Sequence, residues 1–154
     1  MADRPVLIAY DGSSASAGAI TVAASLLGAR PACIVNVWGS VLIGAPVAGG
    51  VPAYLSDLEP KLEEKARETA EQGAQLARDA GFDAEARTAR GSPAWLAIVE
   101  MAETVDAEAI VIGARGLSGL KSVLLGSTSN AVLHHTKRPV LVAQHVVIPA
   151  SSGD

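Results

Sequence analysis

Short apolar runs alternate with longer amphipathic stretches along the chain, and this alternation predicts strands and helices in turn. Four of the runs are almost wholly apolar, which is typical of strands that are buried on both faces of a sheet. Another run alternates small and charged residues, which favours a strand at the edge of a sheet. The five predicted strands cover residues 6–10, 33–37, 84–88, 110–112 and 140–143, and the third of them is the edge strand.

The four intervals between these runs have the periodicity of helices, and residues that typically start or stop helices mark the ends of each one. Ser13 or Ser14 can cap the first helix, and Ser92 can cap the third, with Pro93 in its first turn. The predicted helices cover residues 14–27, about 56–80, about 93–102 and 130–135. Their predicted buried positions are Ala17, Ile20, Ala24 and Leu27; Leu58, Leu62, Ala66, Thr69, Gly73 and Leu76; and Trp95, Leu96, Ile98, Val99 and Ala102.

Five strands that alternate with four helices predict an α/β fold, an open and mostly parallel Rossmann-like sheet with helices on both faces. We expect one domain over residues 1–154, with a flexible loop at 38–54 and a disordered tail at 149–154. Ligands in such sheets bind beyond the carboxyl ends of the strands, where the winding direction reverses. Two candidate ligand segments follow the first and fourth strands, and both can line one crevice only if those strands are neighbours. This reasoning predicts the strand order 3-2-1-4-5.

Composition narrows the class of protein further. The 154 residues are 49% hydrophobic but only 3% aromatic, and the formal net charge is −4. No basic stripe with interleaved aromatic residues is present, so nothing in the chain indicates nucleic-acid binding. No apolar run reaches the roughly 20 residues that span a bilayer, and the single cysteine, Cys33, cannot form an intrachain disulfide. We therefore expect a cytoplasmic protein.

A glycine-rich stretch after the fourth predicted strand contains the candidate chemistry. Gly113, Gly116 and Gly126 are spaced as G-x2-G-x9-G, and Ser127, Thr128 and Ser129 follow directly. Glycines let a backbone approach an anion closely, and the N–H groups of a helix N-terminus favour negative charge. The spacing fits neither the Walker A motif nor the dinucleotide fingerprint. The stretch predicts a phosphate cradle, although the same glycines could simply form turns.

The G-x2-G-x9-G-[S/T] spacing is similar to the motif of the ATP-binding branch of the universal stress protein family. The opening VLIAYDGS, the closing KRPVLVA and the overall length resemble that family too, so the resemblance covers nearly the whole chain. It implies a sheet of order 3-2-1-4-5, of the adenine nucleotide alpha hydrolase-like type, and a bound ATP, with Mg²⁺ as a companion ion. Family members also commonly dimerise through the fifth strand, whose apolar edge needs a cover. The alternative is that the tail of the chain folds back and covers this edge itself.

Several residues fall where the resemblance implies contact with the nucleotide. Asp11 could meet a ribose hydroxyl or Mg²⁺, or could only form a turn with Gly12. Val37 could pack on the adenine base or be an ordinary core residue, and Arg115 could pair with phosphates or remain solvated. The predicted nucleotide-binding residues are Ala9, Tyr10, Asp11, Val37, Gly113, Arg115, Gly116, Gly126, Ser127, Thr128 and Ser129.

The sequence shows no arrangement typical of a dedicated catalyst. There is no supported Ser/His/Asp set, no Cys/His nucleophile signature and no Walker-type lysine. We expect an ATP-binding module with a regulatory or protective role in the stress response, which at most hydrolyses ATP slowly. The alternatives are a slow ATPase or a module for another adenine nucleotide, AMP or cyclic AMP.

Overall fold

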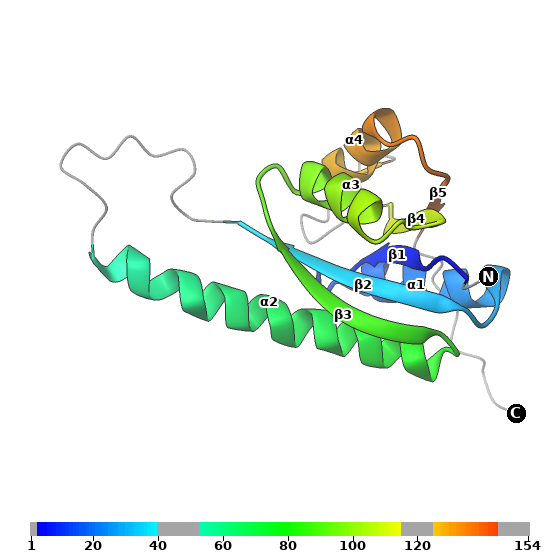
Figure 1. Cartoon of the computed structure of the whole chain (residues 1–154), viewed down its shortest axis with the longest axis horizontal. Coiled ribbons are helices and arrows are strands. Elements are labelled where there is room, and N and C mark those ends of the chain that lie inside the picture. The colour runs from blue at the N-terminus through cyan, green and yellow to red at the C-terminus, as the bar shows by residue number, and fades with distance from the viewer. Residues whose placement is uncertain (1–2, 40–52, 115–124, 145–154) are drawn as a thin grey trace, which may run out of the picture.

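A computed structural model describes residues 3–39, 53–114 and 125–144, and these form a five-stranded parallel sheet covered by helices on both faces (Figure 1). The strand order is β3-β2-β1-β4-β5, as predicted. The elements are β1 (Val6–Ala9), α1 (Ser14–Leu27), β2 (Pro31–Trp38), α2 (Ala53–Asp79), β3 (Asp83–Arg90), α3 (Ala94–Thr104), β4 (Ala109–Gly113), α4 (Ser127–His135) and β5 (Val140–Ala143).

The central strand β1 fixes the register of the sheet. Val6 pairs with Ala32 of β2 on one side and with Ala109 of β4 on the other. Because all the pairs are parallel, the carboxyl ends of β1, β2 and β4 lie along one edge of the sheet. The direction of winding reverses between β1 and β4, and ligands of such sheets bind at this position.

Two layers of apolar side chains lie on the two faces of the sheet. Val6, Ile8 and Ile34 face α1 and α2, and they pack with alanines of those helices. Leu7, Cys33 and Ile110 face the other way, toward α3 and α4. The alternation along each strand explains why the strand sequences read as continuous apolar runs, since both faces of the sheet are buried.

Two predicted core leucines are in fact exposed. Leu76 of α2 is 42% exposed, and Leu96 of α3 is 40% exposed. The inner stripes of both helices consist largely of small residues, which let the helix axes approach the sheet and turn the neighbouring leucines outward. The buried positions are Ala66, Ala70, Gly73, Ala74 and Ala77 in α2, and Ala97, Ile98 and Ala102 in α3.

Several predicted boundaries also shift. Ser13 caps α1 as predicted, and its Oγ accepts a hydrogen bond of 3.1 Å from the N–H of Ser16. The predicted Ser92 cap is wrong, because Pro93 occupies the N-cap position of α3 and makes no side-chain cap bond. The fourth helix begins at Ser127, three residues before its predicted start. In α1 the buried face runs through Ser16, Ala19, Ile20 and Ala23, and Ala17, Ala24 and Leu27 are only partly buried.

The predicted loop at 38–54 is shorter than expected at both ends. Trp38 completes β2, and α2 begins at Ala53. Residues 40–52 and the predicted tail lie outside the described residues. None of the helices in the described ranges combines the length and the hydropathy needed to cross a membrane.

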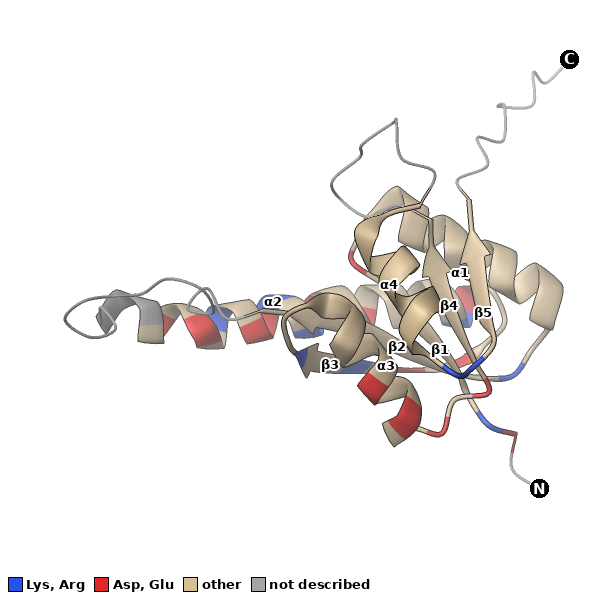
Figure 2. Ribbon diagram, turned by 90° about the horizontal axis from the view of Figure 1, so that it is seen from above, with Lys and Arg blue, Asp and Glu red and all other residues tan. Residues whose placement is uncertain are grey.

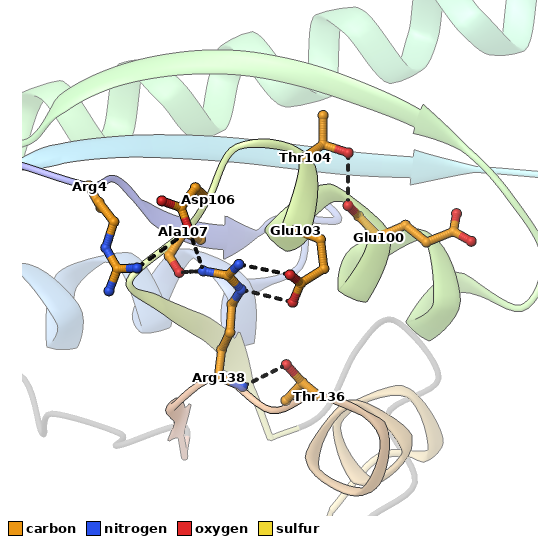
Figure 3. A network of polar contacts seen from close by, with 8 residues as sticks. All are labelled: Arg4, Glu100, Glu103, Thr104, Asp106, Ala107, Thr136 and Arg138. Atoms are coloured by element: carbon orange, nitrogen blue, oxygen red, sulfur yellow. Dashed lines mark hydrogen bonds and ion pairs between the residues drawn. The ribbon is translucent and has the colours of Figure 1, made fainter.

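An arginine network holds the amino-terminal side of the sheet together (Figure 3). Arg138, just before β5, binds both carboxylate oxygens of Glu103 at 2.8 and 2.9 Å. It also donates to Asp106, at 3.2 Å, and to the carbonyl oxygen of Ala107. The hydrogen bonding of Arg138 to the Glu103 carboxylate holds the pKa of Glu103 below its usual range. The network ties the end of α3 to the segment before β5, at the opposite end of the strands from the edge described below.

Candidate functional site

A cavity of about 230 Å³ opens at the carboxyl ends of β1, β2 and β4. Its volume is close to the lower end of the roughly 300–1,000 Å³ range of small-molecule pockets. One part of the wall is apolar and the other is polar. The apolar part comprises Ala9, Val35, Val37, Ala94, Ile98 and Ile112, and the polar part includes Asp11, Ser16, Ser127, Thr128 and Ser129.

The Asp11 carboxylate stands at the polar part, directly after β1. Its Oδ1 accepts hydrogen bonds of 2.9 Å from the N–H of Ser13 and from the hydroxyl of Ser16. Among the described residues, no hydrogen bond reaches its other oxygen, Oδ2. The predicted turn role is therefore observed at Oδ1, and the ligand role stays a prediction that would fall to Oδ2.

The backbone just before Asp11 is fixed from two sides. The N–H of Tyr10 donates to the carbonyl oxygen of Val35, and the side-chain amide of buried Asn36 donates to the carbonyl oxygen of Tyr10, both at 2.9 Å. These bonds extend the contact between β1 and β2 past the last ladder pair, Ala9 with Val35. The site residues that follow β1 thus rest on a rigid element rather than on a free loop.

The ring of Tyr10 packs against α2 where that helix has a glycine. A Cβ at Gly73 would lie 2.6 Å from Cδ1 of Tyr10 and 2.9 Å from Cγ2 of Ile34. Gly73 is therefore needed for the close approach of helix to sheet. Burial, and to a lesser degree the Asp11 carboxylate, raises the pKa of the Tyr10 phenol, so this group is neutral at physiological pH.

The N-terminus of α4 supplies hydrogen-bond donors to the polar part. The first intrahelical bond runs from Asn130 N–H to Gly126 carbonyl oxygen at 3.0 Å, so the N–H groups of residues 127–129 have no partner within the helix. Ser129 is buried, and its hydroxyl lies 3.2 Å from the Ala114 carbonyl oxygen and 3.0 Å from that of Gly126. Ser129 therefore anchors the helix start through its side chain. Ser127 and Thr128 can present backbone N–H and hydroxyl groups to an anion.

The structure gives different reasons for the two motif glycines it describes. A Cβ at Gly113 would lie 3.1 Å from the backbone carbonyl carbon and oxygen of Ala15, so Gly113 lets β4 approach the start of α1 closely. Gly126 has φ of −65° and ψ of 159°, an extended conformation that any residue can adopt. Positive φ is therefore not what Gly126 provides, and the residue lines the cavity wall.

Nine predicted site residues line this one cavity: Ala9, Tyr10, Asp11, Val37, Gly113, Gly126, Ser127, Thr128 and Ser129. Arg115 and Gly116 lie outside the described residues. The sequence reasoning missed five lining residues, Ser16, Val35, Ala94, Ile98 and Ile112. The i, i+4 spacing of Ala94 and Ile98 could have indicated that one face of α3 reaches the cavity. Among the described residues, no group of three or more His, Cys, Asp or Glu side chains could hold a metal ion alone.

Comparison with known proteins shows which family has this sequence pattern. Residues 4–144 match the model of the universal stress protein family. The chain is 29% identical over 145 residues to universal stress protein YxiE of Bacillus subtilis, covering 90% of this chain and 97% of that protein.

Solved structures agree in fold. The structure of MJ0577, a universal stress protein of Methanocaldococcus jannaschii, superposes with a TM-score of 0.77 at 26% identity, covering 93% of this chain and 96% of that one. A universal stress protein in complex with cAMP gives 0.64 at 27% identity, covering 93% and 98%. The Archaeoglobus fulgidus universal stress protein in complex with dAMP gives 0.59 at 26%, covering 92% and 98%. The chain belongs to the universal stress protein family.

Proposed function

We propose that this protein binds ATP and works in the cytoplasm as a regulatory or protective module of the stress response. The observation that carries the proposal is the two-part cavity at the switch point between β1 and β4. Its apolar part suits an adenine base, and its polar part ends at a helix N-terminus that suits phosphates.

The wall residues suggest a definite orientation for the nucleotide. The base lies between Val37 of β2 and the start of α3, and Oδ2 of Asp11 meets either the ribose hydroxyls or the Mg²⁺ of the nucleotide. The phosphates lie at Ser127 and Thr128, with Gly126 giving them room. Arg115 and Gly116, between β4 and α4 in the sequence, complete the cradle in this proposal.

Mg²⁺ fits the site as a companion of the phosphates. Mg²⁺ commonly binds through one or two carboxylates together with substrate phosphates and waters. Asp11 is a single carboxylate whose Oδ2 has no hydrogen-bond partner among the described residues, so it can supply one such ligand. The ion would neutralise phosphate charge, and the protein's own contribution would be to hold the Asp11 oxygen in place.

Relatives support an adenine nucleotide more broadly than they support ATP itself. The complexes with cAMP and dAMP belong to other universal stress proteins that are 26–27% identical to this chain. The alternative is therefore a module for AMP or cyclic AMP, and slow hydrolysis of ATP is a further alternative. Favouring ATP is the complete G-x2-G-x9-G-[S/T] spacing.

Calorimetry with ATP, AMP and cyclic AMP, each with and without Mg²⁺, tests the proposal. We expect ATP to bind more tightly than the other two. Gly126→Val should abolish this binding, because the valine side chain would occupy the phosphate space while its backbone conformation remains accessible. Gly18→Ala is the matched control: a Cβ there meets nothing within 4 Å, and Gly18 does not line the cavity. Tighter binding of cyclic AMP, or unchanged ATP affinity in Gly126→Val, would overturn this assignment.

We further propose that two copies of the chain associate through β5. In the sheet order β5 is an edge strand, so one side of its backbone has no ladder partner among the described residues. Val140, Leu141 and Val142 are only partly buried, and no charged residue interrupts the strand (Figure 2). An exposed apolar edge invites pairing, and a two-fold axis would pair the edge with its own copy.

Sedimentation of the wild type and of Val142→Pro tests the dimer. Proline removes a backbone donor and should shift the variant toward monomer. Thr88→Pro on β3, the opposite edge, is the matched control, because the alternation of the β2–β3 ladder turns the Thr88 N–H away from β2, and it should leave the association unchanged. A wild type that sediments as a monomer at micromolar concentration would refute the dimer.

A further inference from the structure

Ser16 occupies an unusual place in the cavity wall. It lies in the first turn of α1, is only 5% exposed and lines the cavity beside Asp11. Its hydroxyl lies 2.9 Å from Oδ1 of Asp11 and 3.0 Å from the carbonyl oxygen of Ser13. It also lies 3.1 Å from the Ser13 hydroxyl, which can donate to it. A buried hydroxyl with this many partners is held in one position.

The hydroxyl of Ser16 has a single proton, and two acceptors compete for it. A hydrogen bond to a carboxylate is shorter and roughly twice as strong as one between neutral groups, so Asp11 receives the proton. The Ser13 hydroxyl and, at 3.4 Å, the N–H of Asp11 then lie on the acceptor side of the Ser16 oxygen. The three residues form a closed local network in which Ser16 is the shared member.

The consequence for Asp11 is a fixed side-chain orientation. The Asp11 side chain is exposed and has no other side-chain partner among the described residues. The Ser13 N–H and the Ser16 hydroxyl both act on Oδ1, so together they define how the carboxylate plane is turned. A single hydrogen bond from the Ser13 backbone N–H to this exposed side chain leaves rotation about the Cα–Cβ bond of Asp11 much less restricted.

We infer that Ser16 is a positioning residue for the nucleotide site: it locks the Asp11 carboxylate so that Oδ2 is presented to the ligand. The inference rests on the proposed function for its ligand, the ribose or the Mg²⁺ of a bound nucleotide. The Ser16 hydroxyl does not touch that ligand in this account. It acts only through Asp11, and this property makes its effect separable from a direct contact.

A double-mutant cycle on ATP affinity measures that coupling. We expect Ser16→Ala to weaken Mg·ATP binding about tenfold, since a locked ligand group is replaced by a rotating one. In an Asp11→Asn background the same change should have less than a twofold effect. Ser14→Ala is the matched control, because Ser14 lies in the same helical turn but is exposed and does not line the cavity. Equal losses from Ser16→Ala in both backgrounds would overturn the inference.

Nuclear magnetic resonance without nucleotide supplies a readout that does not depend on binding. The Hα–Hβ couplings of Asp11 should show one dominant side-chain rotamer in the wild type and in Ser14→Ala. They should show averaging over rotamers in Ser16→Ala, with the amide spectrum of the rest of the chain unchanged. An Asp11 rotamer that stays fixed in Ser16→Ala would refute the locking role. If instead the couplings behave as expected and the wild type binds no ATP, the nucleotide proposal alone fails.

Discussion

Replacing Gly73 with alanine tests the close contact that supports the site. In the interior of an exposed helix this substitution stabilises by about 1 kcal/mol, because alanine loses less conformational freedom than glycine. Gly73 lies on the inner face of α2, where the new methyl group would meet the ring of Tyr10 at 2.6 and 2.7 Å and Ile34 at 2.9 Å. Carbon atoms pack best about 3.5–4.0 Å apart, so roughly 1 Å must be opened.

The neighbours cannot move away easily. Ile34 is fully buried, and the backbone of Tyr10 is held by hydrogen bonds to Val35 and Asn36. The strain of adding a methylene-sized group to a packed core is about 1–3 kcal/mol. Set against the helix gain of about 1 kcal/mol, this predicts a net loss of up to about 2 kcal/mol for Gly73→Ala. Gly18→Ala in α1, with nothing within 4 Å of the new Cβ, should show the gain alone.

Chemical denaturation followed by circular dichroism measures both free energies of unfolding. We expect Gly18→Ala to be more stable than Gly73→Ala by about 1–3 kcal/mol. For a chain of this length each kcal/mol shifts the thermal midpoint by about 2–4 °C. If Gly73→Ala raised the free energy of unfolding as much as Gly18→Ala does, the close packing of Tyr10 against α2 would be refuted.

Three further predictions concern turnover, the arginine network and the cysteine. Steady-state phosphate release with Mg·ATP should be far below the roughly 10 s⁻¹ median of enzymes, and a rate near that value that is lost in Asp11→Ala would make the protein an ATPase. Arg138→Ala should lower the thermal midpoint without changing ATP affinity, because the arginine network lies at the other end of the strands. Arg138→Lys should recover only part of the loss, since lysine cannot replace the paired hydrogen bonds to Glu103. Burial, with a smaller effect of a nearby carboxylate, raises the pKa of the Cys33 thiol from 9.0 to about 11. The thiol therefore stays protonated to higher pH in the folded state than in the unfolded state, and the free energy of unfolding should fall as the pH rises from 9 to 11. In Cys33→Ala this part of the pH dependence, roughly 2 kcal/mol in the wild type, should disappear; an identical pH profile would contradict the prediction.

The architecture could be predicted because more than one pattern in the sequence indicates it. Apolar runs buried on both faces indicate a parallel sheet, and the two ligand segments after the first and fourth strands determine which strands are neighbours. Helix faces were harder to predict. The prediction placed Ala66, Gly73, Ile98 and Ala102 correctly on the inner faces of α2 and α3. Leu76 and Leu96 were placed there wrongly, because close packing on the sheet favours the small residues beside them. The sizes of the side chains along one helix do not show which of them face the sheet.

Site residues divide in the same way. Those in a contiguous motif or directly after a strand, such as Asp11 and Ser127, could be placed at the cavity from the sequence. Ser16 could not, because its role depends on a hydroxyl and a carboxylate five residues apart meeting at 2.9 Å where α1 begins. The reason why position 113 is a glycine also became clear only from the structure, because Ala15 is distant from it in the sequence and close to it in space.

The identity of the small molecule that copurifies with the protein tests the central claim most directly. The purified chain would be denatured without added nucleotide, and the released molecules identified by mass spectrometry. Gly126→Val, prepared in the same way, controls for nonspecific carryover. The account predicts ATP at near-stoichiometric amounts from the wild type and little from the variant. Release of cyclic AMP or AMP in place of ATP, or of equal ATP from both proteins, would contradict it.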